Sequence, residues 1–193
     1  ASGGDSNSVS SQISSGVSSI FSTAGAFAAL KTNGSVVTWG AGASGGNSSD
    51  VSDSLMSGVL QIYSNRYAFA ALKEDNSVVT WGSTPSGGDS SSVSGQLMSD
   101  VQGIFSNENC FAALKENGSV VTWGRSENGG DSSSVTAQLS SGVKRIFATS
   151  NAFAALKEDG SVVVWGNPED GGNGNLRDVS GQLSFGIAEV VST

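Results

Sequence analysis

The sequence predicts an all-β fold: a β-propeller-like array of about four blades plus a half-unit, with short helical turns between strands. The stretch "FAALKENGSVVTWG" beginning at Phe111 has near copies beginning at Phe27, Phe69 and Phe153. The tryptophans recur with the same period of 42 residues, at Trp39, Trp81, Trp123 and Trp165. A fixed period of this length is the signature of a repeat architecture, in which neighbouring repeats share one core.

Each repeat is expected to contain three strands in an antiparallel meander. In the first repeat these are "GVSSIF" (16–21), "AFAALK" (26–31) and "SVVTWG" (35–40), the last two flanking a two-residue turn. Asn-Gly and Asp-Gly pairs between β-rich segments indicate a hairpin, because both residues tolerate positive φ. The turn pairs are Asn33-Gly34, Asn117-Gly118 and Asp159-Gly160, and Asn76 once replaces the glycine.

The rest of each repeat begins with a Gly-Gly pair, as in "GGDSSSVSGQL" at Gly87. Val93, Gln96 and Leu97 follow helical spacing after a Ser/Asp cluster that can cap a helix N-terminus. This pattern predicts one or two helical turns packed on the sheet. A fourth short strand is the alternative.

The chain is expected to form a single repeat domain over residues 1–193. Its repeats span residues 3–44, 45–86, 87–128 and 129–170, followed by the half-unit 171–193. The half-unit would close a ring, cap an open array or mark a cut from a longer chain.

The repeated aromatic residues are assigned to structural packing. A three-stranded sheet of this size cannot bury its apolar face alone, so the repeats must pack against one another. A tryptophan beside a glycine at one fixed position in every repeat suits a large wedge between adjacent sheets. The residues given this structural role are Phe27, Phe69, Phe111, Phe153, Trp39, Trp81, Trp123 and Trp165.

The repeat resembles that of the regulator of chromosome condensation (RCC-type) family of β-propellers. The shared features are the Leu, Asp/Asn-Gly, Val and Trp-Gly spacing of "FAALKENGSVVTWG" and the "GGDSSSV" segment that follows, over essentially all 193 residues. The sequence is most similar to the compact, Gly/Ser-rich arrays of such repeats in marine microbial and algal proteins. The resemblance implies the propeller fold.

The resemblance does not extend to the activity of the family's founding member, a nucleotide-exchange factor that docks on chromatin. The repeats here are shorter and fewer than the usual seven blades, and "GGDS" or "GGNS" replaces the family's "GQLG". This acidic chain also shows no basic tail and no inserted wedge-like loop. Only the fold is carried over.

Charge excludes one class of partner. The chain has 9 basic and 17 acidic residues, a formal net charge of −8, whereas nucleic-acid affinity rests mainly on Lys and Arg. No apolar run approaches the roughly 20 residues that span a bilayer, so a soluble or peripheral protein is expected. Ala1 is consistent with a processed N-terminus in an organelle lumen or outside the cell, but the compartment is not fixed.

The residue inventory predicts a protein that is not an enzyme and uses no cofactor. The chain has no histidine, which removes Ser-His-Asp and Cys-His catalysis and histidine-based metal sites. The carboxylates at the hairpin tips recur in three of the four repeats and so mark no unique site. The single Cys110 replaces an alanine of the other repeats and is expected to be a small buried side chain.

Calcium is the one metal that the sequence pattern suggests. Asp5, Asp89 and Asp131 recur beside the Gly-Gly pairs, but calcium needs six to eight oxygen ligands and each repeat supplies one such Asp. Asn47 and Asn173 replace it in the other two copies. A tight turn capped by Asp or Asn explains both residue types, so no metal site is assigned and calcium is kept as the alternative.

The candidate binding surface is where the repeats differ. The first variable window holds residues 24–25, 66–67, 108–109 and 150–151, and the second begins at 41, 83, 125 and 167. In a meander both windows lie at the end of the sheet opposite the constant hairpin turn. Loops on one face commonly bind ligands in repeat proteins, although simple drift of exposed loops is the alternative. The candidate contacts are Arg66, Tyr67, Arg125, Glu127, Asn167 and Pro168.

These observations predict a non-enzymatic repeat scaffold that binds protein partners as a subunit of a larger assembly. One alternative is an accessory peripheral subunit on the soluble face of a membrane complex, photosynthetic if the algal resemblance holds. Another is an extracellular adhesin or glycan-binding array fragment. A small-molecule ligand is not indicated by any motif.

Overall fold

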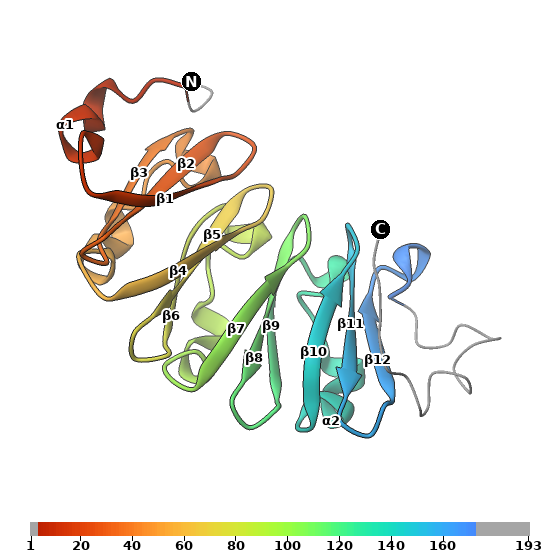
Figure 1. The fold of residues 1–193 in the computed structure, drawn as a ribbon. Helices are drawn as coiled ribbons and strands as arrows, with labels where there is room; N and C mark the ends of the chain where they lie inside the picture. Colours follow the sequence, from red (N-terminus) through yellow and green to blue (C-terminus); the bar gives the residue numbers. More distant parts are fainter. Residues whose placement is uncertain (1–3, 173–193) are drawn as a thin grey trace. The chain divides into compact units, whose positions relative to one another are not determined.

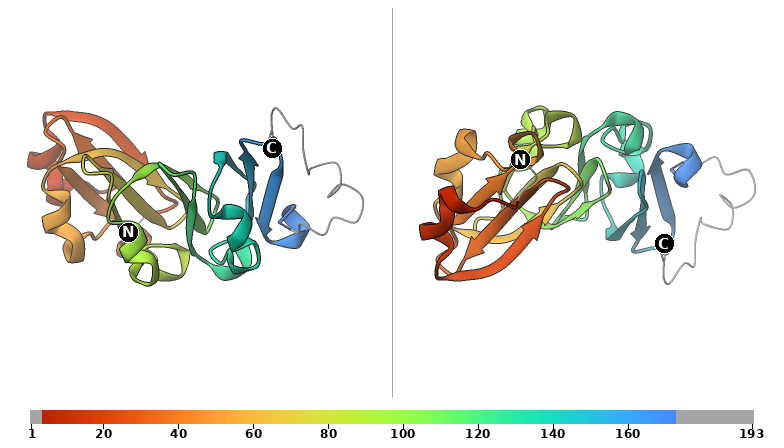
Figure 2. Two further views of the ribbon diagram at one scale, coloured as in Figure 1. Left: turned by 90° about the horizontal axis from the view of Figure 1, so that it is seen from below. Right: turned by 90° about the horizontal axis from the view of Figure 1, so that it is seen from above.

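The computed structural model describes residues 4–172, which form four three-stranded antiparallel sheets with short helical turns between them (Figure 1). Each sheet is built from one continuous stretch of chain, as the colours in Figure 2 show. The predicted all-β class and the three-stranded meander are therefore confirmed. The chain divides into two compact units, the N-terminal unit Ala1–Ser99 and the C-terminal unit Asp100–Thr193, with two sheets in each.

The N-terminal unit holds the first two sheets. The first has the order β1 (Val17–Ser22), β2 (Ala26–Lys31) and β3 (Val36–Gly40). The second has the order β4 (Val59–Ser64), β5 (Ala68–Lys73) and β6 (Val78–Gly82).

The C-terminal unit repeats this arrangement. Its first sheet has the order β7 (Val101–Ser106), β8 (Cys110–Lys115) and β9 (Val120–Gly124). Its second has the order β10 (Val143–Ala148), β11 (Ala152–Lys157) and β12 (Val162–Gly166). The expectation of one domain over residues 1–193 stays a prediction, and the half-unit lies outside the described residues apart from Gly171 and Gly172.

Short helices, and not a fourth strand, connect the sheets. In the N-terminal unit they are η1 (Asn7–Val9), α1 (Ser10–Ile13), η2 (Gly42–Ser44), η3 (Ser49–Leu55), η4 (Thr84–Ser86) and η5 (Ser91–Gln96). In the C-terminal unit they are η6 (Ser126–Asn128), η7 (Ser133–Val135), α2 (Thr136–Leu139) and η8 (Pro168–Asp170). The leucine that follows or ends the longer turn is buried, as at Leu97 and Leu139, which anchors the turn on its sheet.

The hairpin turn differs from the two-residue turn that the sequence predicts. The backbone NH of Gly34 donates to the carbonyl of Lys31, and the NH of Lys31 donates to the carbonyl of Ser35. Gly34 has φ +76°, whereas Asn33 is not among the residues with positive φ. The turn is therefore a three-residue loop with a bulge at the glycine. The Asn33 backbone does not adopt positive φ, and the Asn33 side chain accepts the NH of Ser35.

Phe and Trp of each repeat form a cross-strand pair. Phe27 pairs with Trp39 in register, and their rings stack with centroids 5.3 Å apart. The other three pairs stack in the same way, at 5.1–5.4 Å: Phe69 with Trp81, Phe111 with Trp123, and Phe153 with Trp165. All six of these residues are buried, whereas Phe27 and Trp39 are partly exposed.

The core of each unit lies between its two sheets. In the N-terminal unit, Phe69 and Trp81 of the second sheet pack against Ala26, Ala28 and Leu30 of the first. In the C-terminal unit the equivalent core joins Phe153 and Trp165 to the first sheet of that unit, at Cys110, Ala112 and Leu114. The small alanines and the cysteine leave room for the aromatic pair of the neighbouring sheet.

Candidate functional site

Both variable windows lie side by side at one end of every sheet. The backbone NH of Ala41 donates to the carbonyl of Gly25 at 2.8 Å, which joins the two windows of the first repeat. The same bond recurs in the other repeats: Ser83 to Tyr67 at 3.0 Å, Arg125 to Asn109 at 3.2 Å, and Asn167 to Asn151 at 2.9 Å. The hairpin turns lie at the opposite end of each sheet, as the meander requires.

The windows of the two sheets in each unit are also joined. In the N-terminal unit the NH of Ala24 donates to the carbonyl of Arg66 at 2.9 Å, and in the C-terminal unit the NH of Glu108 donates to the carbonyl of Ser150 at 3.1 Å. Each unit therefore has one continuous loop surface. We name them the N-terminal rim (residues 24–25, 41–44, 66–67 and 83–86) and the C-terminal rim (residues 108–109, 125–128, 150–151 and 167–170).

An anchor side chain before the first window holds each rim, and the sequence analysis missed it. Oδ1 of Asn65 accepts the NH groups of Tyr67 and Ala68, and its Nδ2 donates to the carbonyl of Ser86 at 2.7 Å. Asn107 makes the same three bonds in its own repeat, the last of them to the carbonyl of Asn128 at 2.6 Å.

Threonine serves as the anchor in the first and last repeats. Oγ1 of Thr23 donates to the carbonyl of Ser44 at 2.9 Å, and Oγ1 of Thr149 donates to the carbonyl of Asp170 at 3.0 Å. The signal available in the sequence is that this position holds either Thr or Asn in every repeat. Both side chains carry a donor and an acceptor at short reach, as a loop anchor needs.

The N-terminal rim carries one charged residue, Arg66. Its guanidinium lies over the ring of Tyr67, 5.5 Å from the ring centroid, in a cation–π arrangement. Arg66 is exposed and Tyr67 is partly buried. The two predicted contacts from this repeat therefore form one amphipathic pair.

The C-terminal rim is acidic. Four carboxylates, those of Glu108, Glu127, Glu169 and Asp170, and a single cation, Arg125, give it a formal charge of −3. Arg125, Glu127, Glu169 and Pro168 are exposed. This rim thus holds four of the six predicted contacts, and Arg66 and Tyr67 belong to the other rim.

Polar side chains beneath the C-terminal rim form a connected network. Nδ2 of the buried Asn128 donates to Oδ1 of Asn151 at 2.6 Å, and Nδ2 of Asn151 donates to Oδ2 of Asp170 at 3.1 Å. Oδ1 of Asn167 accepts the NH of Glu169 at 2.9 Å and caps η8. Asn167, a predicted contact, therefore has a structural role in capping η8. Among the four predicted contacts on the C-terminal rim, the exposed ones are Arg125, Glu127 and Pro168.

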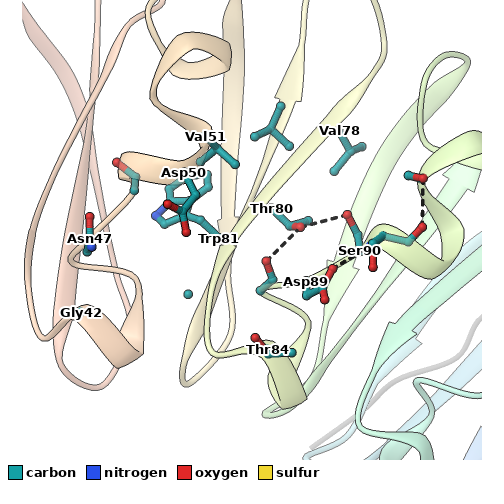
Figure 3. Close-up of a pocket in the computed structure, with 16 residues that line it drawn as sticks. Gly42, Asn47, Asp50, Val51, Val78, Thr80, Trp81, Thr84, Asp89 and Ser90 are labelled. Atoms are coloured by element: carbon teal, nitrogen blue, oxygen red, sulfur yellow. Dashed lines mark hydrogen bonds between the residues drawn. The ribbon is translucent and has the colours of Figure 1, made fainter.

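A groove of about 630 Å³ in the N-terminal unit opens next to rim residues Gly42 and Thr84 (Figure 3). Its polar wall is largely bonded to itself. Oγ1 of Thr80 donates to Oγ of Ser90 at 2.9 Å, and Oδ1 of Asp89 accepts the NH of Ser91 at 2.9 Å. The Thr80 bond fastens the Gly-Gly segment to β6, and the Asp89 bond caps a turn within that segment, so we assign the groove a structural origin.

The three calcium candidates act as turn caps. Oδ1 of Asp5, Asp89 and Asp131 each accepts the backbone NH two residues ahead, at 3.0, 2.9 and 2.8 Å. Asn47 makes the equivalent bond to Ser49 at 3.0 Å, which explains why Asn replaces Asp. Within residues 4–172 no three or more His, Cys, Asp or Glu side chains cluster as a metal site.

Cys110 lies in the core of the C-terminal unit. It is fully buried, and its Sγ donates to the carbonyl of Arg125 at 3.0 Å. Burial raises the pKa of the Cys110 thiol to about 12, so the thiol stays protonated at neutral pH. The expected buried side chain is confirmed.

The comparisons with known proteins concern the fold. No protein-family model and no curated protein matches the chain. Among solved structures, it is similar to yeast RCC1 (Prp20) bound to Kap60, with 16% identity and a TM-score of 0.49 over 78% of this chain and 42% of that one. It is similar to human WBSCR16 with 18% identity and a TM-score of 0.48, over 78% of this chain and 47% of that one.

A third similar structure is the ectodomain of the Physcomitrella patens receptor kinase CR4, with 17% identity and a TM-score of 0.48, over 78% of this chain and 40% of that one. The chain spans less than half the length of each of these proteins. RCC1 belongs to the family whose repeat the sequence resembles.

Within residues 4–172, no helix combines the length and the apolar character that crossing a membrane requires.

Proposed function

We propose that this chain is a non-enzymatic repeat scaffold that binds a protein partner through its loop rims, as a subunit of a larger assembly. One observation carries the proposal: the residues that differ between repeats are joined by hydrogen bonds into a continuous rim in each unit. The constant Phe-Trp pairs lie within the sheets instead. Recognition loops held by an invariant scaffold are the usual arrangement in repeat proteins.

The chemistry of the rims indicates what they would contact. The C-terminal rim, with a formal charge of −3, suits a partner surface that carries Lys and Arg. The N-terminal rim offers Arg66 and Tyr67, and these two residue types are enriched among the residues that dominate binding energy at protein interfaces. The Arg66 guanidinium over the Tyr67 ring is a preformed contact for such a surface.

The catalytic alternative is not supported by the groups available. The chain has no histidine, and its single thiol is buried with a raised pKa. Asp89 and Asp131 accept backbone NH groups that lower their pKa values, which favours the ionised form and a turn-capping role.

Two finer assignments are also proposals: a peripheral subunit of a membrane complex and an extracellular glycan-binding array. The crosslinking experiment described next distinguishes between them.

The test is site-specific photo-crosslinking of the chain in its source cells. A photo-reactive residue at Glu127 lies on the C-terminal rim, and a matched one at Glu158 lies at the hairpin turn of the same unit; both positions are exposed. We expect protein adducts from position 127 and few from position 158. The mass spectrum of the adduct identifies a membrane-complex subunit or another protein.

Charge reversal supplies the second measurement. In the chain labelled at position 127, Glu108→Lys together with Glu169→Lys changes the sign of the C-terminal rim and should weaken the adduct, whereas Glu158→Lys should leave it unchanged. Equal crosslinking from both ends of the sheet, or adducts only from position 158, rules out the rim as the binding surface. Binding of glycans with no protein adduct favours the array alternative.

A further inference from the structure

Within each unit, one sheet presents a front face to the back face of the sheet before it. In the N-terminal unit, Ile62, Phe69 and Trp81 form the front of the second sheet and pack on Ala28 and its neighbours at the back of the first. Ile62 is 1% exposed and Trp81 is 4% exposed. Nε1 of Trp81 also donates to the carbonyl of Gly45 at 3.0 Å.

The C-terminal unit contains a second copy of this interface. Ile146, Phe153 and Trp165 pack on the back of the preceding sheet, at Ala112 and its neighbours. Nε1 of Trp165 donates to the carbonyl of Gly129 at 3.1 Å, which repeats the bond of the first interface. The same two faces therefore fit together twice within one chain.

The front face of the first sheet carries the same residue types but is open in the part of the chain that the structure describes. Ile20 is 61% exposed, against 1% for Ile62 and 4% for Ile146 at the equivalent positions. Phe27 and Trp39 are stacked like the other pairs but are partly exposed. Helical turns at the start of the chain cover part of this sheet, where Val9 packs on Val37, and they leave Ile20 uncovered.

Within residues 4–172, the back face of the last sheet is open in the complementary way. Ala154 is partly exposed, whereas the equivalent Ala28 and Ala112 are fully buried. Its cross-strand partner is Val164, where the other repeats have a threonine, so the face is more apolar.

Gly171 completes this back face. It has φ +90°, and no atom of residues 4–172 outside its chain neighbours lies within 4 Å of where its Cβ would be. A Cβ on Gly45 or Gly129, by contrast, would lie 2.6 or 2.8 Å from the ring of Phe69 or Phe153. The last glycine thus has the geometry of the two glycines that receive an aromatic pair.

We propose that the two open faces bind each other between copies of this chain. The front of the first sheet, with Ile20, Phe27 and Trp39, docks on the back of the last sheet of a second copy, with the aromatic pair over Gly171 and beside Ala154. We choose a second copy as the occupant because each chain carries both a front face and a back face of the matching kind. The two internal interfaces show that these two kinds of face fit together. The contact joins two different surfaces, so it is heterologous and extends head to tail.

Sedimentation velocity over a range of protein concentrations tests the proposal with two surface variants. Ile20→Glu places a charge on the front face, where the side chain is 61% exposed in the free sheet. Gly171→Asn adds a side chain to the back face and keeps a residue that tolerates positive φ. Met98→Glu is the matched control for the first variant, since Met98 is 73% exposed. Gly95→Ala is the control for the second, because no atom of residues 4–172 beyond its chain neighbours lies within 4 Å of its Cβ position.

The unmodified chain and both controls should show a weight-average mass that rises with concentration. Each variant alone should sediment as one chain, because it has lost one of the two faces. An equimolar mixture of the two variants should form a species of two chains and no larger one, since one intact front and one intact back remain. Thermal unfolding of each variant, followed by tryptophan fluorescence, verifies that it is folded.

Three results would overturn the proposal. The first is an unmodified chain that sediments as one chain at every concentration. The second is loss of association in Ile20→Glu but not in Gly171→Asn, which indicates pairing of two front faces. The third is a mixture of variants that fails to associate. None of these results depends on what the loop rims bind.

Discussion

Gly45 lies directly against the ring of Phe69: a Cβ on Gly45 would be 2.6 Å from Cδ2 of that ring. No residue other than glycine fits this position, because real Cβ atoms do not approach a ring carbon so closely. The contact joins the first two sheets of the N-terminal unit, and Gly129 and Phe153 repeat it in the C-terminal unit.

Replacing Gly45 should therefore destabilise the chain in two ways: through a steric clash with Phe69 and through the strain of a non-glycine residue at positive φ. Gly45→Ala and Gly171→Ala both force alanine into positive φ, which costs about 1–2 kcal/mol. Only Gly45→Ala also overpacks an aromatic ring, which adds about 1–3 kcal/mol. Urea unfolding of both variants, at a concentration where the chain is monomeric, measures the difference. Equal losses of unfolding free energy would contradict the packing described here.

The rim anchor Asn107 should be replaceable by threonine but not by alanine. Asn107→Ala leaves the NH of Cys110 and the carbonyl of Asn128 without their partner, at a cost of about 1–3 kcal/mol. Asn107→Thr introduces the residue that makes the equivalent bonds at Thr23 and Thr149, so it should lose much less. Chemical denaturation of the two variants is the measurement. A threonine variant as unstable as the alanine variant would show that the anchor is specific to asparagine.

Stability should be insensitive to pH near neutrality and should fall in acid. The chain has no histidine to titrate between about pH 5 and pH 8. Hydrogen bonds from Ser91 and Ser133 lower the pKa values of Asp89 and Asp131 below the ordinary 3.8. A lowered folded-state pKa stabilises the fold above the unfolded-state pKa, and this contribution is lost as the pH falls through the folded-state value.

The control for the acid prediction comes from the repeats themselves. Asp89→Asn combined with Asp131→Asn keeps the turn, as Asn47 does, but removes both titrating groups. The free energy of unfolding of the double variant should fall less between about pH 5 and pH 2 than that of the unmodified chain. Identical acid profiles would show that these two caps do not contribute to the pH dependence.

The thiol of Cys110 should resist modification while the chain is folded. Its side chain is fully buried, and its pKa of about 12 leaves almost no thiolate at neutral pH. We expect one equivalent of thiol to react with Ellman's reagent in denaturant and none to react promptly under native conditions. Fast labelling of the folded chain would contradict the placement of Cys110 in the core.

Much of the local structure could be predicted from the repeats alone. Alternation along "FAALK" and "SVVTW" sets which residues share a face, so the Phe-Trp pair follows from the strand register. The meander then places both variable windows at one end of the sheet. The turn type was predicted incorrectly, because the Asn33 side chain bonds to Ser35 and only Gly34 needs positive φ.

What the tertiary structure decided is which of the repeated faces are covered. Ile20 and Ile62 occupy the same position in nearly identical repeats, yet one is exposed and the other is buried. Sequence determines that an isoleucine lies on the front of its sheet, because that depends only on local alternation. Burial depends on whether another sheet packs there, and only the assembled structure shows this. The anchors of the rims were likewise decided by contacts 21 residues apart in the chain, as between Asn65 and Ser86.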